Sequence, residues 1–174
     1  MTGAKGAVAA TMGYFNFLLL AISLLPGSVA ASHQGGDKRP CPEPQEATDS
    51  RFHVGQVWKY KTRPDEEQST LTILRIESLP KLGVIIHIRV DDIRLRNCTG
   101  GPEPNNIAHM PFSRDAIERS VVKLAKEGGA VPDFQDGYDE WRRACGGVYT
   151  ITVAEAIAAN QKTFNAGLGC GPSK

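Results

Sequence analysis

Two histidines and an aspartate in the middle of the chain are residue types that serve in general acid–base catalysis. His87, Arg89 and Asp91 occupy alternate positions of one apolar run, so a strand would place their side chains on the same face. His109 precedes Ser113, a residue type that begins helices, and the dipole of a helix N-terminus lowers the pKa of a histidine and attracts anions. The hypothesis is a hydrolase site in which His87 or His109 acts with a carboxylate such as Asp91. The alternative is that His87 lies on the hydrated face of a sheet.

Four cysteines, none of them in the first 31 residues, suggest a second kind of chemistry. In an exported protein an even number predicts two disulfide bonds, with three possible pairings. The expected path of the chain returns Cys170 to the end of the domain that holds Cys145, which favours the pairs Cys145–Cys170 and Cys41–Cys98. Zinc binding and thiol catalysis are the alternatives, but the sequence has no CxxC or HxxxH spacing to support either.

The most densely charged loop, residues 63–67, joins two expected strands and is a candidate binding edge. Trp58 and Tyr60 on the preceding strand, with Arg63 and Glu66 on the loop, are the residues that such an edge would use. The simpler interpretation is a hydrated hairpin tip, because turns between strands are rich in polar residues for conformational reasons alone.

The common catalytic motifs are absent from the sequence: GxSxG, HExxH, the phosphate-binding P-loop and GxGxxG. A glycosidase needs two carboxylates across a cleft, and Asp91, Asp92, Glu66 and Glu77 include no pair that spacing singles out. We therefore expect no cofactor and no metal. We also expect no nucleic-acid partner, because a formal charge of +1 gives no basic excess.

Local patterns predict an α+β fold in a single domain, with a three-stranded antiparallel meander followed by helices and one further short strand. Runs rich in Ile, Val and Thr indicate the strands, whereas the capping box over 152–155 indicates a helix start. Phe134, Tyr138 and Trp141 recur at helical spacing, which is typical of a buried helix face. The predicted strands are 54–62, 69–77, 83–95 and 148–151, and the predicted helices are 113–127, 133–145 and 152–164.

The first 31 residues predict a secretory signal peptide. They contain one charge, Lys5, then an apolar run over 14–25, a Pro-Gly pair, and small residues suited to cleavage after Ala30 or Ala31. A transmembrane anchor is the alternative, but the run is shorter than the roughly 20 residues that cross a bilayer. We therefore expect a secreted or periplasmic protein with no stable membrane anchor after cleavage.

Composition divides the remaining chain into a compact domain and two tails. Residues 32–51 hold almost no large apolar side chain, which predicts a flexible N-terminal tail, and the glycine-rich end over 166–174 predicts a C-terminal tail. The compact domain is predicted over 52–165. The whole chain is 41% hydrophobic and 22% charged, which is typical of a globular protein.

Three stretches of this domain resemble a group of short uncharacterised bacterial proteins. They are Phe52-His-Val-Gly-Gln-Val-Trp-Lys-Tyr-Lys-Thr-Arg-Pro-Asp-Glu-Glu67, His109-Met-Pro-Phe-Ser113, and Trp141 together with Thr152-Val-Ala-Glu-Ala-Ile157. The resemblance covers about residues 52–164 and implies a bacterial origin, but it implies no activity and no site residue.

The function predicted from these observations is that of a binding or interaction module whose partner is a protein or an envelope component. The alternative is a small hydrolase that acts on envelope polymers or peptides. A purely structural envelope component has less support, because the sequence contains no repeat.

Overall fold

The computed structural model of the protein describes residues 41–171. The signal peptide predicted over 1–31, residues 32–40 of the predicted N-terminal tail and the last three residues lie outside the described residues. Within the described part, no helix combines the length and the apolar character that crossing a membrane requires.

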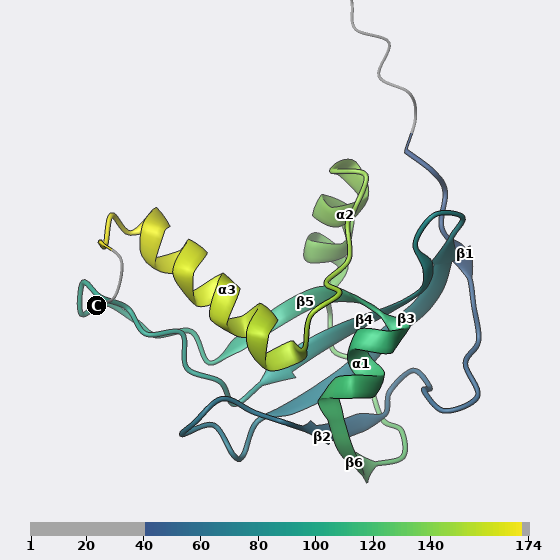
Figure 1. The fold of residues 1–174 in the computed structure, drawn as a ribbon, viewed down its shortest axis with the longest axis horizontal. Coiled ribbons are helices and arrows are strands. Elements are labelled where there is room, and N and C mark those ends of the chain that lie inside the picture. The colour runs from purple at the N-terminus through teal and green to yellow at the C-terminus, as the bar shows by residue number, and fades with distance from the viewer. Residues whose placement is uncertain (1–40, 172–174) are drawn as a thin grey trace, which may run out of the picture. The chain divides into compact units, whose positions relative to one another are not determined.

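Residues 41–171 form a six-stranded antiparallel sheet and three helices (Figure 1). The strand order is β5-β4-β3-β2-β6, and the short β1 pairs with the far half of β3. The strands are β1 (Gln45–Glu46), β2 (Val57–Tyr60), β3 (Thr70–Leu79), β4 (Gly83–Asp91), β5 (Asn106–Ser113) and β6 (Val121–Lys126). The helices are α1 (Arg114–Ser120), α2 (Gln135–Arg143) and α3 (Val153–Gly167).

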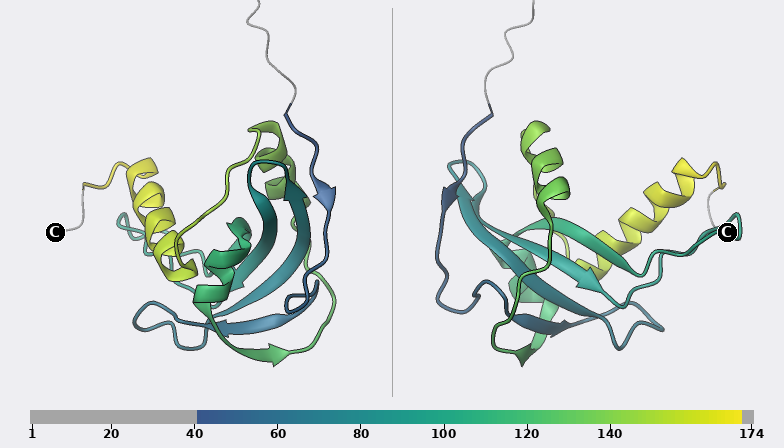
Figure 2. Two further views of the ribbon diagram at one scale, coloured as in Figure 1. Left: turned by 45° about the vertical axis from the view of Figure 1, so that its right-hand side comes forward. Right: turned by 180° about the vertical axis from the view of Figure 1, so that it is seen from behind.

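The two faces of the sheet are covered by different helices (Figure 2). Ile86, Ile88 and Val90 of β4 point into the larger core, which α1 and α3 close. Ile85 and His87, at the positions between them, face α2 instead. The sheet is therefore apolar on one face and mixed on the other, because side chains of a strand alternate between faces.

A β-bulge in β3 determines which residues face α2. Ile73 pairs with Ile88, but Arg75 pairs with His87, so Leu74 is an extra residue on β3. Such an insertion exchanges the faces of the side chains that follow it. Ile73 therefore belongs to the larger core, whereas the odd-numbered residues that follow it, including Glu77, lie on the α2 face.

The α+β class and the antiparallel meander are confirmed, because β2, β3 and β4 are consecutive antiparallel neighbours. The meander also has a fourth strand, β5, which the sequence patterns did not predict. Pro111 within β5 is compatible with an edge strand, where one side of the ladder needs no partner. The predicted strand over 83–95 ends earlier, at Asp91, and Asp92 takes a positive φ of 57°.

The single helix predicted over 113–127 is wrong. Ser113 caps α1 by accepting a hydrogen bond from the backbone N–H of Ala116, as predicted, but the helix ends after seven residues. Residues 121–126 form β6, in which Leu124 pairs with Trp58 and Val121 pairs with Tyr60. The apolar spacing that fits a helix also fits this strand, and the open edge of β2 decides between them.

The strand predicted over 148–151 is reduced to one isolated bridge between Tyr149 and Phe112. The capping box is present, since Thr152 and Glu155 bond each other's backbone N–H groups at the start of α3. With no strand leading away and back, α3 runs in another direction and does not bring Cys170 to Cys145.

The predicted disulfide pairing is therefore wrong, although all four cysteines are paired. The bonds are Cys41–Cys145 and Cys98–Cys170, with Cα–Cα distances of 5.0 and 6.4 Å. The first joins the N-terminal arm, residues 41–51, to the end of α2, and the second joins the end of α3 to the loop after β4. Two disulfides indicate an oxidising extracellular or periplasmic environment.

The N-terminal arm is held on the domain well before residue 52, where the compact part was predicted to begin. Gln45 and Glu46 of β1 pair with Ser78 and Glu77 of β3. The arm therefore forms part of the surface around α2 and β3.

Tryptic digestion without reduction tests the disulfide pairing. We expect one cross-linked species that contains Cys41 and Cys145 and a second that contains Cys98 and Cys170. Both should separate on reduction and be identified by mass spectrometry. A species that joins Cys145 to Cys170 would contradict the arrangement of α2 and α3.

Candidate functional site

A row of polar side chains from three neighbouring strands lies beneath α2. Glu77 on β3 and His87 on β4 have no exposed surface, and His109 on β5 is partly exposed. Nδ1 of His87 is 2.8 Å from Nε2 of His109. Nε2 of His87 is 3.2 Å from Oε1 of Glu77, in an alignment too poor for a hydrogen bond. The three side chains form a continuous chain from a carboxylate to the edge of the site.

Helix α2 covers this row with aromatic and hydroxyl groups. The hydroxyl of Tyr138 lies 3.0 Å from each carboxylate oxygen of Glu77, to which it donates. The rings of Trp141 and His87 meet edge to face with centroids 4.7 Å apart. Gly137 allows α2 to approach β5 closely, because a Cβ at this position would lie 2.8 Å from Cβ of His109.

The environment shifts the pKa values of this cluster in different directions. Burial alone would raise the pKa of Glu77, but contacts with His87 and Tyr138 and the charge of Arg75 hold it below its usual range. Burial, together with the charge of His87, lowers the pKa of His109 to about 4. Burial and the Glu77 carboxylate raise the pKa of Tyr138. A buried carboxylate therefore stays ionised beside a neutral His109 at neutral pH.

Asp91, predicted as the carboxylate partner of the histidines, does not join them. Its side chain accepts a hydrogen bond of 2.7 Å from Nε of Arg89 at the far end of β4. The sequence reasoning missed Glu77 in this role, because the bulge at Leu74 turns it toward His87 and cannot be read from alternation alone. The row Glu77–His87–His109 leads from a buried carboxylate to the edge of the site, but Glu77 and His87 are not hydrogen-bonded and His87 is inaccessible to a substrate.

The four residues predicted to form a binding edge around the loop 63–67 do not share one surface. Trp58 and Tyr60 are core residues with exposures of 6% and 5%, so they are not available to a partner. Glu66 is also buried and pairs with Arg63. These two loop residues line a polar pocket of about 400 Å³ that reaches the side of α3.

A more apolar groove lies at the other end of the molecule, between the N-terminal arm, the β3–β4 turn and the end of α2. Its volume is about 460 Å³. Cys41 and Cys145 form one wall with their disulfide, and Lys81 and Arg142 are its basic residues. We call this cavity the apolar groove. Its apolar lining consists of Pro42, Pro44, Leu79, Pro80, Leu82 and Trp141.

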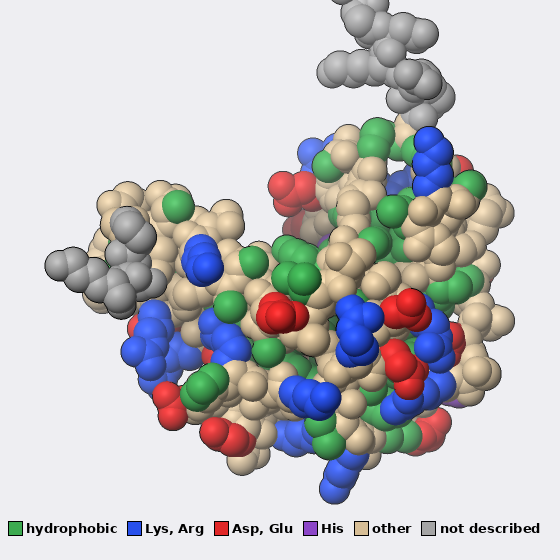
Figure 3. Space-filling model, in the orientation of Figure 1, with side chains coloured by type: hydrophobic (Ala, Val, Ile, Leu, Met, Phe, Trp, Pro, Cys, Tyr) green, Lys and Arg blue, Asp and Glu red, His purple; other side chains and the backbone are tan. Residues whose placement is uncertain are grey.

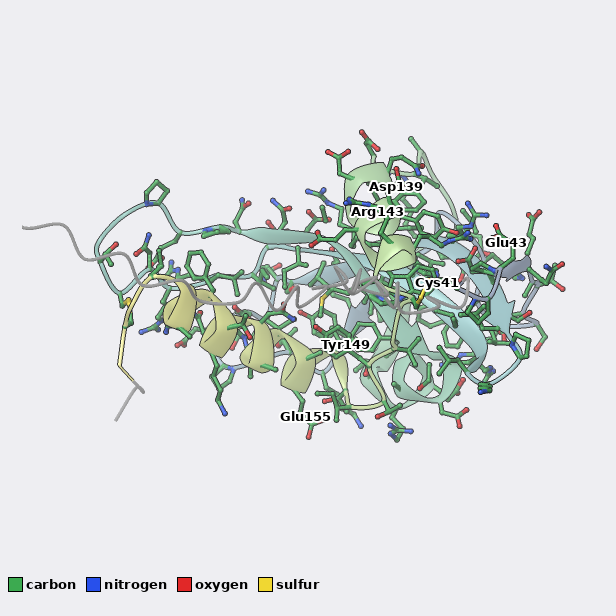
Figure 4. The ribbon with its side chains drawn as sticks, turned by 90° about the horizontal axis from the view of Figure 1, so that it is seen from above. Cys41, Glu43, Asp139, Arg143, Tyr149 and Glu155 are labelled. Carbon is green, nitrogen blue, oxygen red and sulfur yellow. A yellow bond between two sulfur atoms is a disulfide. The ribbon has the colours of Figure 1, made fainter. Side chains whose placement is uncertain are left out.

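Another polar pocket adjoins the apolar groove and shares Arg142 with it. Its volume is about 490 Å³, and we name it the arginine pocket after Arg75, Arg142 and Arg143. Figure 4 shows Asp139 and Arg143 on α2, with Cys41 and Glu43 on the neighbouring arm. Nη2 of Arg142 is 2.7 Å from Oε2 of Glu43.

Among residues 41–171, no group of three His, Cys, Asp and Glu side chains is arranged to hold a metal ion. The sequence did not point to the apolar groove, because one wall is the arm that was predicted as a tail. The alternation of prolines with Cys41 and Glu43 was the only local signal of an extended, ordered arm.

The lowered pKa of His109 makes folding stability depend on pH. The unfolded chain protonates His109 near pH 6.5 and the folded protein only near pH 4, so the unfolded state binds more protons between these values. Stability should therefore fall as the pH drops from 6.5 to 4. We expect His109→Gln to remove roughly 2 kcal/mol of that loss, after allowance for its partial exposure.

Urea unfolding at neutral pH and near pH 4 measures this difference. The exposed His53 supplies the control, since His53→Gln should retain the full loss of the wild type. Equal losses in wild type and His109→Gln would show that the histidine pair does not carry the pH dependence. Glu77, whose pKa is also lowered, loses its contribution as the pH falls through its own folded pKa, in both proteins.

Comparison with protein-family models, with curated proteins and with solved structures gives no match to this chain. The function therefore rests on the geometry described above.

Proposed function

We propose that the protein is an exported binding module that takes up an apolar group of an envelope component or partner protein in the apolar groove. The observation that carries the proposal is the groove itself, with a volume of about 460 Å³ and walls of proline, leucine and tryptophan. Ligand sites are typically concave and mostly apolar, with a few polar groups at defined positions. Figure 3 shows hydrophobic and basic side chains next to one another over the end of the molecule near α2.

The walls of the groove are supported on several sides, which favours a preformed site. The Cys41–Cys145 disulfide ties the arm to α2. The indole N–H of Trp141 donates a hydrogen bond of 2.8 Å to the carbonyl of Gly147. A Cβ on Gly146 would lie within bonding distance of the indole ring, so the chain there must be glycine for Trp141 to occupy its position. A groove with fixed walls loses little conformational freedom on binding.

Export of the protein is the second part of the proposal. The predicted signal peptide over 1–31 supports it, and so does the use of all four cysteines in disulfides. Cleavage after Ala30 or Ala31 would leave a short polar segment before the arm.

The hydrolase alternative has less support. His87 and His109 are close together, as such a site requires, but His87 has no exposed surface and Asp91 lies elsewhere. The chain Glu77–His87–His109 is better explained as a polar contact that holds α2 on the sheet.

A neutral apolar dye, N-phenyl-1-naphthylamine, tests the groove directly. Its fluorescence should rise on mixing with the oxidised protein. Leu82→Asp places a charge in the groove, and we expect it to weaken dye binding by about five- to tenfold.

Leu168→Asp is the matched control, because Leu82 and Leu168 are equally exposed at 37% and Leu168 lies outside the groove. It should bind the dye as the wild type does. Absence of dye binding to the wild type, or an equal loss in both variants, would overturn the proposed site.

A further inference from the structure

The apolar groove and the arginine pocket meet along the N-terminal arm. Pro42 and Pro44 line the groove, whereas Glu43 between them lines the arginine pocket. Arg142 belongs to both. An apolar wall and a cluster of guanidinium groups are therefore neighbours, and the side chain at the junction is a cation.

The three guanidinium groups of the arginine pocket are held in different ways. Arg75 donates to the buried Glu77 and lies 4.9 Å from the ring centre of Tyr138. Nε of Arg143 donates to the backbone carbonyl of Asp139. Both are therefore anchored within the fold.

Arg142 has a different kind of partner. It bonds the carboxylate of Glu43, whose side chain is 72% exposed. An ion pair so open to water is weak, because water and salt compete with it. An anion from solution can therefore compete with Glu43 for Arg142.

We infer that the two pockets together bind a single-chain anionic amphiphile, an aliphatic chain ending in a carboxylate. The chain lies in the apolar groove and the carboxylate replaces Glu43 on Arg142. This inference rests on the proposed function, because it names the ligand class of the same groove. The charges are consistent with a replacement of this kind: the three arginines are balanced by Glu43, Asp139 and the buried Glu77, so displacement of Glu43 leaves Arg142 as one positive charge at the junction.

Displacement of the dye by dodecanoate and by dodecanol tests the inference. The two compounds share a chain and differ in charge. We expect dodecanoate to displace the dye from the oxidised protein at about tenfold lower concentration at low ionic strength. The advantage should shrink as salt is added, because salt screens the charge contact.

Two variants should change dodecanoate binding in opposite directions. Glu43→Gln removes the competing carboxylate and should strengthen binding about threefold, whereas Arg142→Gln should remove the advantage over dodecanol. Glu46→Gln is the control for the first, since Glu46 is exposed on the same arm and lines neither pocket. It should bind as the wild type does. Lys81→Gln tests the other groove cation and should leave most of the advantage intact.

The possible results distinguish a failure of the anionic ligand from a failure of the proposed binding function. Equal displacement by dodecanoate and dodecanol would overturn the anionic ligand and leave an apolar binding groove. Loss of the dodecanoate advantage in Lys81→Gln but not in Arg142→Gln would overturn the role of the arginine pocket. Binding to phosphatidylglycerol vesicles without displacement by dodecanoate would show that the anion belongs to a membrane lipid, and would also overturn the inference. Failure of the dye itself to bind would overturn the proposed function.

Discussion

A carboxylate without exposed surface must find partners to replace the water it has lost, and much of this fold depends on how Glu77 does so. Arg75 donates from the same strand, the ring of His87 approaches from the next one, and the hydroxyl of Tyr138 reaches it from α2. The contact with Tyr138 matters most for the rest of the molecule. It joins α2 to the sheet at one defined place, because displacement of the helix would leave a buried charge short of a hydrogen bond.

The position of α2 in turn defines the groove. Trp141 and Arg142 belong to the last turn of this helix, and Cys145 follows two residues after its end. Each lies on the wall of the groove or at its junction with the arginine pocket. The buried polar cluster and the surface site are thus two sides of one helix. This arrangement explains why the pKa of His109 is lowered although the cluster offers a substrate no place to bind.

Local sequence patterns predicted the elements whose signals are local. The caps at Ser113 and Thr152 and the alternation in β4 depend on neighbouring residues, and all three are found in the structure. The fold class followed from them. Strand β6 and the early end of α1 depend instead on the free edge of β2, which lies far away in the sequence. No periodicity over 121–126 contains that information.

The candidate site was less accessible to prediction for the same reason. Glu77 faces His87 only because of one additional residue in β3, and the groove exists only because the arm is tied to α2. The histidine pair could be anticipated as residue types but not as neighbours, since β5 was not recognised as a strand. Pairing between residues far apart in the sequence therefore determines which side chains meet at the site. Composition and local spacing show only which residue types are available.

The two disulfides have a consequence for the integrity of the chain. Their spans of 104 and 72 residues interleave, because Cys98 lies inside the first span and Cys145 lies inside the second. A protease that cleaves one peptide bond anywhere between Cys41 and Cys170 therefore leaves two fragments that are still covalently joined. The alternative pairs Cys41–Cys98 and Cys145–Cys170 would release two separate pieces after a cut between them. Interleaving keeps the molecule in one piece whichever loop is nicked first.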